Sequence, residues 1–132
     1  MGDVIRLDPA DSFRLEEARA VVEILRRVTG EAVKEFERLR AQHDGLDPES
    51  APARRLRERM DETVREWSEK VERLGGLPKG LWLVDFDSGR GFYWCWRYPE
   101  AAVEFVHDYD SGFSGRRPIG PAELDEDEQA DA

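Results

Sequence analysis

The spacing of apolar residues changes from about 3.6 to about 2 residues near Gly80, and this change constrains the fold more than any other feature. Before Gly80, apolar residues recur every three or four positions, which is the period of an amphipathic helix. After it they alternate with polar residues, which is the period of a half-buried strand. Helices followed by strands predict an α+β fold, here a long antiparallel two-helix hairpin followed by a three-stranded antiparallel β-meander.

The first predicted helix covers residues 13–43. Its apolar residues step by four and three over about four heptads, and Val21, Ile24, Val28 and Val33 widen the stripe beyond a two-stranded seam. The stripe comprises Leu15, Ala18, Val22, Leu25, Thr29, Ala32, Phe36, Leu39 and His43. A stripe this wide predicts contact with more than one neighbour.

The second predicted helix covers residues 52–74. Pro52 suits a first helical turn, and Gly75 with Gly76 suits a C-terminal stop. Its stripe comprises Leu56, Met60, Thr63, Val64, Trp67, Val71 and Leu74. The connecting residues 44–50 are turn formers, so we expect the two helices to run antiparallel.

Two helices with broad apolar faces cannot bury both faces against each other. The sheet can cover part of the hairpin, and a second copy can cover the rest as a four-helix bundle. We therefore predict a homodimer formed through the helices; the alternative is a monomer whose sheet covers the whole stripe.

Three strands are predicted, at residues 81–87, 92–98 and 103–109. Residues 88–91 provide the first turn, and residues 99–102 are taken as a four-residue second turn. This register places Cys95 opposite Val106, Trp94 opposite His107, and Arg97 opposite Glu104 as an ion pair.

Alternation along these strands predicts an aromatic face that packs on the helices and a mixed face that does not. The aromatic face comprises Phe92, Trp94, Trp96, Tyr98, Phe105, His107 and Tyr109. The mixed face comprises Tyr93, Cys95, Arg97, Glu104, Val106 and Asp108. The face that Trp82, Val84 and Phe86 join depends on the register of the first turn, which stays open.

The net charge of −10 is concentrated at the C-terminal end, where residues 120–132 hold six acidic residues and no basic one. We predict a disordered acidic tail there, an N-terminal arm at residues 1–12, and a single domain at residues 13–119. There is no basic stripe to neutralise phosphates, so we expect no nucleic-acid partner.

Cys95 is the only cysteine of the 132 residues, which excludes a disulfide within the chain. No window contains the roughly 20 apolar residues of a membrane span, and the N-terminus has no apolar signal core. We therefore expect a cytoplasmic protein without a membrane partner.

One block of residues carries a resemblance. Cys95-Trp96-Arg97, then His107, then Gly112-Phe113-x-Gly115-Arg116 are similar to the uncharacterised prokaryotic family catalogued as domain of unknown function 2203. The opening Phe13-x-Leu15-Glu16-Glu17-Ala18 resembles that family's first helix, so the resemblance covers residues 13–119. The chain departs from the family pattern at Val106 and at Pro99, where the family usually has Trp and Gly. The resemblance implies a fold and a site location, and no activity.

Two kinds of reactive site can be drawn from this block. Cys95 with His107 and Asp108 suggests a thiol nucleophile, but the predicted register places Cys95 and His107 on opposite faces. A metal site could draw on His107 with the carboxylates of Asp85, Asp87, Asp108 and Asp110. Alternation separates His107 from Asp108, so we predict no catalytic residue, no metal ligand and no cofactor.

The segment 108–118 is the predicted binding region. Its glycines allow close backbone approach, Phe113 suits an anchor, and Arg116 suits bidentate contact with an anion. Ligand-binding candidates are therefore Arg97, His107, Asp108, Phe113 and Arg116. The alternative is a structural lock in which Phe113 is buried and Arg116 pairs with a carboxylate.

These observations favour a non-enzymatic structural or interaction protein that acts as a homodimer. The alternative is a protein that binds a small molecule or anion, with hydrolase activity as one version of it, at the aromatic sheet and the segment 108–118.

Overall fold

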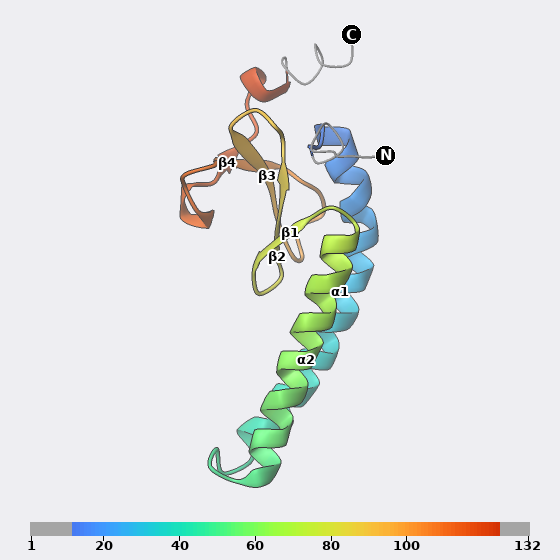
Figure 1. Ribbon diagram of the computed structural model, residues 1–132, viewed down its shortest axis with the longest axis vertical. Coiled ribbons are helices and arrows are strands. Elements are labelled where there is room, and N and C mark those ends of the chain that lie inside the picture. The colour runs from blue at the N-terminus through green and yellow to red at the C-terminus, as the bar shows by residue number, and fades with distance from the viewer. Residues whose placement is uncertain (1–11, 125–132) are drawn as a thin grey trace, which may run out of the picture.

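A computed structural model describes residues 12–124 of the chain. Two long helices form an antiparallel hairpin, and a five-stranded sheet packs on one half of it (Figure 1). The predicted α+β class is correct, although the sheet has five strands instead of three. None of the described helices is long and apolar enough to cross a membrane.

Helix α1 spans Leu15–Asp44 and helix α2 spans Ala51–Arg73. The first backbone amides of each are capped: Glu17 accepts the Arg14 N–H at 2.8 Å, and the Ser50 hydroxyl accepts the Ala53 N–H at 3.3 Å. At about 1.5 Å per residue, α1 is about 45 Å long. This length carries the hairpin beyond the sheet, so its far half packs only on itself (Figure 1).

The helices meet along the predicted stripe. Thr29 is fully buried inside the hairpin, where its hydroxyl accepts a 2.8 Å hydrogen bond from the Trp67 indole N–H. The buried apolar residues of the helices are Leu15, Ala18, Val22, Leu25, Leu39, Ala53, Trp67 and Val71. A Trp with its N–H satisfied contributes a large apolar area without an unpaired polar group.

The sheet is antiparallel in the order β1 to β5. Its strands are β1 Leu77–Gly80, β2 Leu83–Asp87, β3 Phe92–Arg97, β4 Phe105–Asp108 and β5 Arg117–Pro118. Strands β1 and β5 were not predicted. The first has no alternating pattern, and the second is only two residues long and contains a proline.

The first predicted strand begins two residues late, because Trp82 adopts a left-handed backbone conformation with φ 64°. This turn directs the Trp82 ring into the helices, where its centroid lies 5.0 Å from Trp67 and 5.7 Å from Phe36. Val84 and Phe86 are fully buried in the same core, so they lie on the sheet face that packs on the helices.

The register predicted between the second and third strands was wrong by one residue. Cys95 pairs with Phe105, Trp94 with Val106, and Tyr93 with His107. The connection runs from residue 98 to 104 instead of 99 to 102, since a turn closes with the Glu100 N–H bonded to the Arg97 carbonyl at 2.8 Å. A one-residue slip moves every side chain of a strand to the opposite face.

Two predictions fail with that register. Phe105, His107 and Tyr109 do not belong to the aromatic face on the helices. That face keeps Phe92, Trp94, Trp96 and Tyr98 and gains Val106. The predicted Arg97–Glu104 pair does not form across the strands, because Arg97 pairs with Leu83 in β2 and Glu104 precedes β4.

The chain ends of the domain are tied to the sheet. The Trp94 indole donates to the Phe13 carbonyl at 2.7 Å, and the Ile119 N–H donates to the Glu104 carbonyl at 3.1 Å. Residues 121–124 form a helical turn in which Glu123 accepts from Arg117 at 3.1 Å. The rest of the predicted acidic tail and nearly all of the predicted N-terminal arm lie outside the described residues.

Candidate functional site

The sheet face turned away from the helices, which we call the outer face, gathers the polar side chains of three strands. Asp85 pairs with Cys95 across β2 and β3, and Tyr93 pairs with His107 across β3 and β4. Residues paired in this way point to the same side of a sheet. The two registers therefore bring Asp85, Cys95 and His107 together.

His107 and Asp85 form a buried pair. The Nε2 atom of His107 lies 2.9 Å from Oδ2 of Asp85, and their side chains are 6% and 2% exposed. On the other side of the ring, Nδ1–H donates to the Asp108 carbonyl at 3.0 Å. With Nδ1 as the donor, Nε2 of a neutral imidazole is an acceptor that faces a carboxylate acceptor.

A proton must therefore lie between Nε2 of His107 and Oδ2 of Asp85. It makes either the imidazole cationic or the carboxyl neutral, so the pair as a whole has no net charge in either form. Burial raises the pKa of the Asp85 carboxyl, and the neighbouring His107 opposes that rise. The second oxygen, Oδ1, is buried and accepts no hydrogen bond of normal geometry, although the Cys95 thiol lies close enough to interact with the carboxyl.

Cys95 lies against this pair in the sheet interior. It is fully buried, and its Sγ is within 4.8 Å of ligand atoms of Asp85 and His107. Burial, with the charge of Asp85, raises the pKa of the Cys95 thiol to about 12. The prediction that Cys95 and His107 point to opposite faces was wrong, but a thiol this buried and this weakly acidic is not an activated nucleophile.

A cavity of about 230 Å³ opens above the pair. Asp85 and His107 belong to its lining, and we call it the outer-face cavity. The other lining residues are Lys79, Leu83, Tyr93, Tyr109, Ser111, Gly112 and Phe113. The Tyr93 ring lies 5.4 Å from His107 and 4.9 Å from Tyr109, so aromatic rings form a continuous wall.

The rim of this cavity is also polar. The Lys79 ammonium lies 5.4 Å from the Tyr93 ring centroid, a cation–π distance. The Tyr109 hydroxyl donates to Asp87, and partial burial together with this bond raises the pKa of Tyr109. Ser111 donates weakly to the Asp108 carbonyl at 3.3 Å.

Residues 12–119 match the model of a family described as an uncharacterized conserved protein, DUF2203. The chain belongs to the DUF2203 family. Comparison with curated proteins and with solved structures found no match. The predicted family is thus confirmed, and its description assigns no activity.

Only two of the five residues predicted to bind a ligand line the outer-face cavity, namely His107 and Phe113. Arg97 is exposed and stacks near the Phe113 ring at 5.6 Å. Asp108 is exposed and pairs with Arg117 at 3.1 Å. Neither contributes to the cavity wall of this DUF2203 domain.

Arg116 is held inside the protein. Its guanidinium makes two hydrogen bonds to Glu100, at 2.8 and 2.9 Å, and stacks on the rings of Phe105 at 4.0 Å and Phe113 at 4.6 Å. A cation already paired and stacked in this way has no free fork for an anion. The geometry is that of a lock that fixes the segment 108–118 over the sheet.

Sequence reasoning did not include Lys79, Tyr93, Tyr109 and Ser111 among the binding candidates, and it considered Asp85 only as a metal ligand that it then rejected. The available signal was an acidic residue, Asp85, between the apolar residues Val84 and Phe86 of one strand. Placing Asp85 beside His107 requires the registers of both hairpins, and the register of the second hairpin was predicted wrongly.

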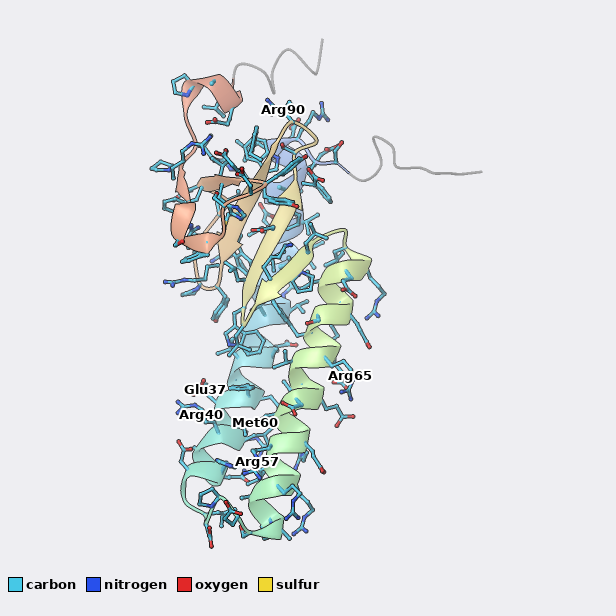
Figure 2. All side chains as sticks on the ribbon, turned by 60° about the vertical axis from the view of Figure 1, so that its left-hand side comes forward. Glu37, Arg40, Arg57, Met60, Arg65 and Arg90 are labelled. Atoms are coloured by element: carbon cyan, nitrogen blue, oxygen red, sulfur yellow. The ribbon has the colours of Figure 1, made fainter. Side chains whose placement is uncertain are left out.

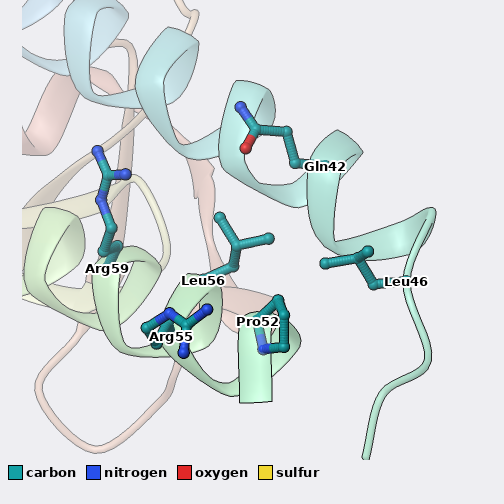
Figure 3. A pocket seen from close by; sticks show the side chains of 6 residues that line it. All are labelled: Gln42, Leu46, Pro52, Arg55, Leu56 and Arg59. Atoms are coloured by element: carbon teal, nitrogen blue, oxygen red, sulfur yellow. The ribbon is translucent and has the colours of Figure 1, made fainter. Parts of the chain in front are cut away.

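A larger cavity of about 560 Å³ lies at the tip of the hairpin, where Leu46, Pro52 and Leu56 meet the side chains of Arg55 and Arg59 (Figure 3). It is mostly apolar and open. It contains no buried titratable pair, so the outer-face cavity is the better candidate for specific chemistry in this DUF2203 chain.

Proposed function

We propose that this protein binds a small anionic organic molecule in the outer-face cavity. The observation that carries the proposal is the His107–Asp85 pair, buried at the floor of that cavity with one carboxylate oxygen unpartnered. Burying such groups destabilises a fold unless every polar atom is paired. A pair that is incompletely satisfied and opens into a cavity is more typical of a binding site than of a structural core.

The charge of the cavity favours an anion. The His107–Asp85 pair sums to zero charge, and Lys79 adds one positive charge at the rim. Asp108 is paired with the cationic Arg117, and Asp87, which keeps its charge while accepting the Tyr109 hydroxyl, does not line the cavity. A negative group at Lys79 with an apolar or flat part against Tyr93 and Phe113 suits this arrangement.

Cavity size limits the ligand. A volume of about 230 Å³ lies below the range of about 300–1,000 Å³ typical of drug-sized ligands. The ligand class that fits is a small organic acid, smaller than a nucleotide.

Binding is better supported than hydrolysis. Both ring nitrogens of His107 already have partners, and no serine, threonine or cysteine among residues 12–124 is hydrogen-bonded to it as a nucleophile. Covalent catalysis needs such a contact. For hydrolysis, His107 would have to act as a base, and the proton that it shares with Asp85 would first have to leave Nε2.

A thermal-shift screen of organic acids tests the proposal. A ligand at about 100 times its Kd stabilises the folded state by about 2.7 kcal/mol, which is a clear rise in melting temperature. Lys79→Ala should remove this rise, and the matched control Lys34→Ala, an exposed lysine of α1, should retain it. The proposal fails if no acid stabilises the protein, or if both variants respond like wild type.

A second proposal is that the chain forms a homodimer through its helices and works as a structural or interaction protein. Ile24 on α1 is 46% exposed, and the far half of the hairpin is not covered by the sheet (Figure 1). An extended helical pair of this kind buries more apolar surface when a second copy completes a four-helix bundle.

Charged side chains limit where that second copy can sit. Charged side chains follow the hairpin, as Figure 2 shows for Glu37, Arg40 and Arg65. Arg40 pairs with Glu37, and Arg57 reaches across to His43 and the Pro48 carbonyl. The dimer contact is therefore expected on the apolar stripe around Ile24, in the N-terminal half of α1, away from these charges.

Light scattering tests the dimer. A dimer of the 15.2 kDa chain has twice that mass. Ile24→Glu should give the monomer mass, while Leu81→Glu, an equally exposed leucine outside the helices, should keep the dimer. A monomer mass for wild type at micromolar concentration would contradict the proposal.

We also propose a cytoplasmic location without a nucleic-acid or membrane partner. The support is the single reduced cysteine, Cys95, and the net charge of −10. Fractionation of cells expressing the untagged protein would test the location, and recovery in the membrane or secreted fraction would contradict it.

A further inference from the structure

We propose that Asp85, Cys95 and His107 form a binding site for one divalent transition metal ion of the zinc type. This inference deepens the proposed function, because the ion would lie at the floor of the same outer-face cavity. The three side chains offer a carboxylate oxygen, a sulfur and an imidazole nitrogen, all within 4.8 Å of one another. This mixed donor set is one that zinc accepts.

The unsatisfied oxygen of Asp85 is the second, independent observation. Oδ1 has no hydrogen-bond partner although the Asp85 side chain is 2% exposed. A buried carboxylate normally has its oxygens paired, since an unpaired one destabilises the fold. A cation bound by Asp85 through Oδ2 would neutralise the carboxylate, which lowers the cost of leaving Oδ1 without a donor.

His107 is already oriented as metal-binding histidines are. Its Nδ1–H donates to the Asp108 carbonyl at 3.0 Å, which directs Nε2 to the cluster as the ligand atom. Metal-ligating histidines usually hold their second nitrogen in this way, by a carboxylate or a backbone carbonyl. The bond also fixes the plane of the ring.

Binding an ion requires the three ligand atoms, which lie within 4.8 Å of one another, to rearrange around it. Two ligand atoms at about 2.0–2.1 Å from a tetrahedral ion are separated by about 3.3 Å. Nε2 of His107 and Oδ2 of Asp85 lie 2.9 Å apart, so the pair must open slightly as the ion replaces the proton between them. The Cys95 thiol loses its proton to solvent at the same time.

Three protein ligands leave one coordination position open. Asp85 and His107 line the cavity while Cys95 lies buried beneath them, so the open position faces the cavity. Zinc sites with three protein ligands keep a fourth position for water or for a bound molecule. An anionic ligand held by Lys79 would reach the ion there.

Cobalt(II) titration of the wild-type protein tests the site without any substitution. Cys95 is the only cysteine in the chain, so a sulfur-to-cobalt charge-transfer band can arise only from it. We expect this band to saturate at one ion per chain, together with the visible bands of a tetrahedral ion. No stoichiometric binding, or binding without the sulfur band, would overturn the proposal.

Two variants sharpen the test. Cys95→Ser should remove the band and weaken cobalt binding by at least about 100-fold. Asp87→Asn changes a carboxylate of the same sheet outside the cluster and should bind like wild type. If Cys95→Ser does not fold, X-ray absorption of the zinc-loaded wild type gives the answer: one sulfur neighbour supports the site, and none refutes it.

The test of the metal site and the test of organic-acid binding can fail independently of each other. If chelator-treated protein still binds an organic acid through Lys79 and cobalt does not bind, the metal site alone is refuted. If cobalt binds through Cys95 and no acid binds, the proposed organic ligand alone is refuted.

Discussion

Removing Glu100 should destabilise this protein more than removing any surface acid, because Glu100 holds Arg116. Glu100 accepts two hydrogen bonds from Arg116 and one from the Arg97 backbone N–H at 2.9 Å. The side chains of Arg116 and Glu100 are only 13% and 23% exposed. Glu100→Ala would leave a nearly buried guanidinium whose Nε is already unpartnered.

The magnitude follows from that burial. Breaking a buried ion pair typically costs about 3–5 kcal/mol, and residual solvent contact reduces this to about 2–3 kcal/mol here. A domain of this size is stable by about 5–15 kcal/mol, so the loss is a large fraction of the total. At about 4 °C per kcal/mol, the melting temperature should fall by about 8–12 °C.

Circular dichroism during thermal and urea unfolding provides the assay. The matched control is Glu35→Ala, which breaks an exposed pair with Arg38 of similar length, 2.7 Å, and should change stability little. Adding Arg116→Met to Glu100→Ala should restore part of the loss, because no unpaired charge then remains. The reasoning is refuted if Glu100→Ala melts like wild type or if the second substitution makes it worse.

Three further predictions concern the core and the loop. Because Cys95 is buried, Ellman's reagent should modify the folded protein far more slowly than the urea-unfolded chain, and rapid modification of the folded protein would contradict the burial. The folded pKa of Cys95, about 12, exceeds the ordinary 9.0, so the stability it contributes is complete below about pH 9 and is lost as pH rises towards 12. The free energy of unfolding, measured in urea at about pH 8 and about pH 10.5, should fall less in Cys95→Ala than in wild type. The difference should be up to about 1.4 kcal/mol per pH unit, and equal losses would contradict the raised pKa of Cys95. Phe113 is half-buried, so Phe113→Ala should cost less than the roughly 3–5 kcal/mol of a fully buried Phe, while exposed Arg117→Ala should change the melting temperature little; the opposite order would contradict the described packing.

The helices were predictable because their signals are local and repeated. The stripe from Leu15 to Leu39 repeats over many turns. Pro52 lies in the first turn of α2, and Gly75 follows its end with a positive φ of 91°. Each turn adds independent evidence, so a single exception does not change the assignment. The long antiparallel pair follows from the short turn between them.

The site was less predictable because it depends on strand register. Asp85, Cys95 and His107 come from three strands, and each hairpin must be in register to bring them together. The second connection is longer than the predicted four residues, since Glu100 turns back onto Arg97. That difference moved His107 to the other face, and nothing in the alternation of β4 itself reveals it.

The central claim is that the outer-face cavity binds a ligand, and amide chemical-shift mapping tests it most directly. A set of small organic acids would be titrated into isotope-labelled wild-type protein. We expect the shifts to move at Lys79, Tyr93, His107 and Tyr109, which surround the His107–Asp85 pair. Shifts confined to the hairpin tip around Leu46 and Leu56, or no shifts at all, would contradict the claim.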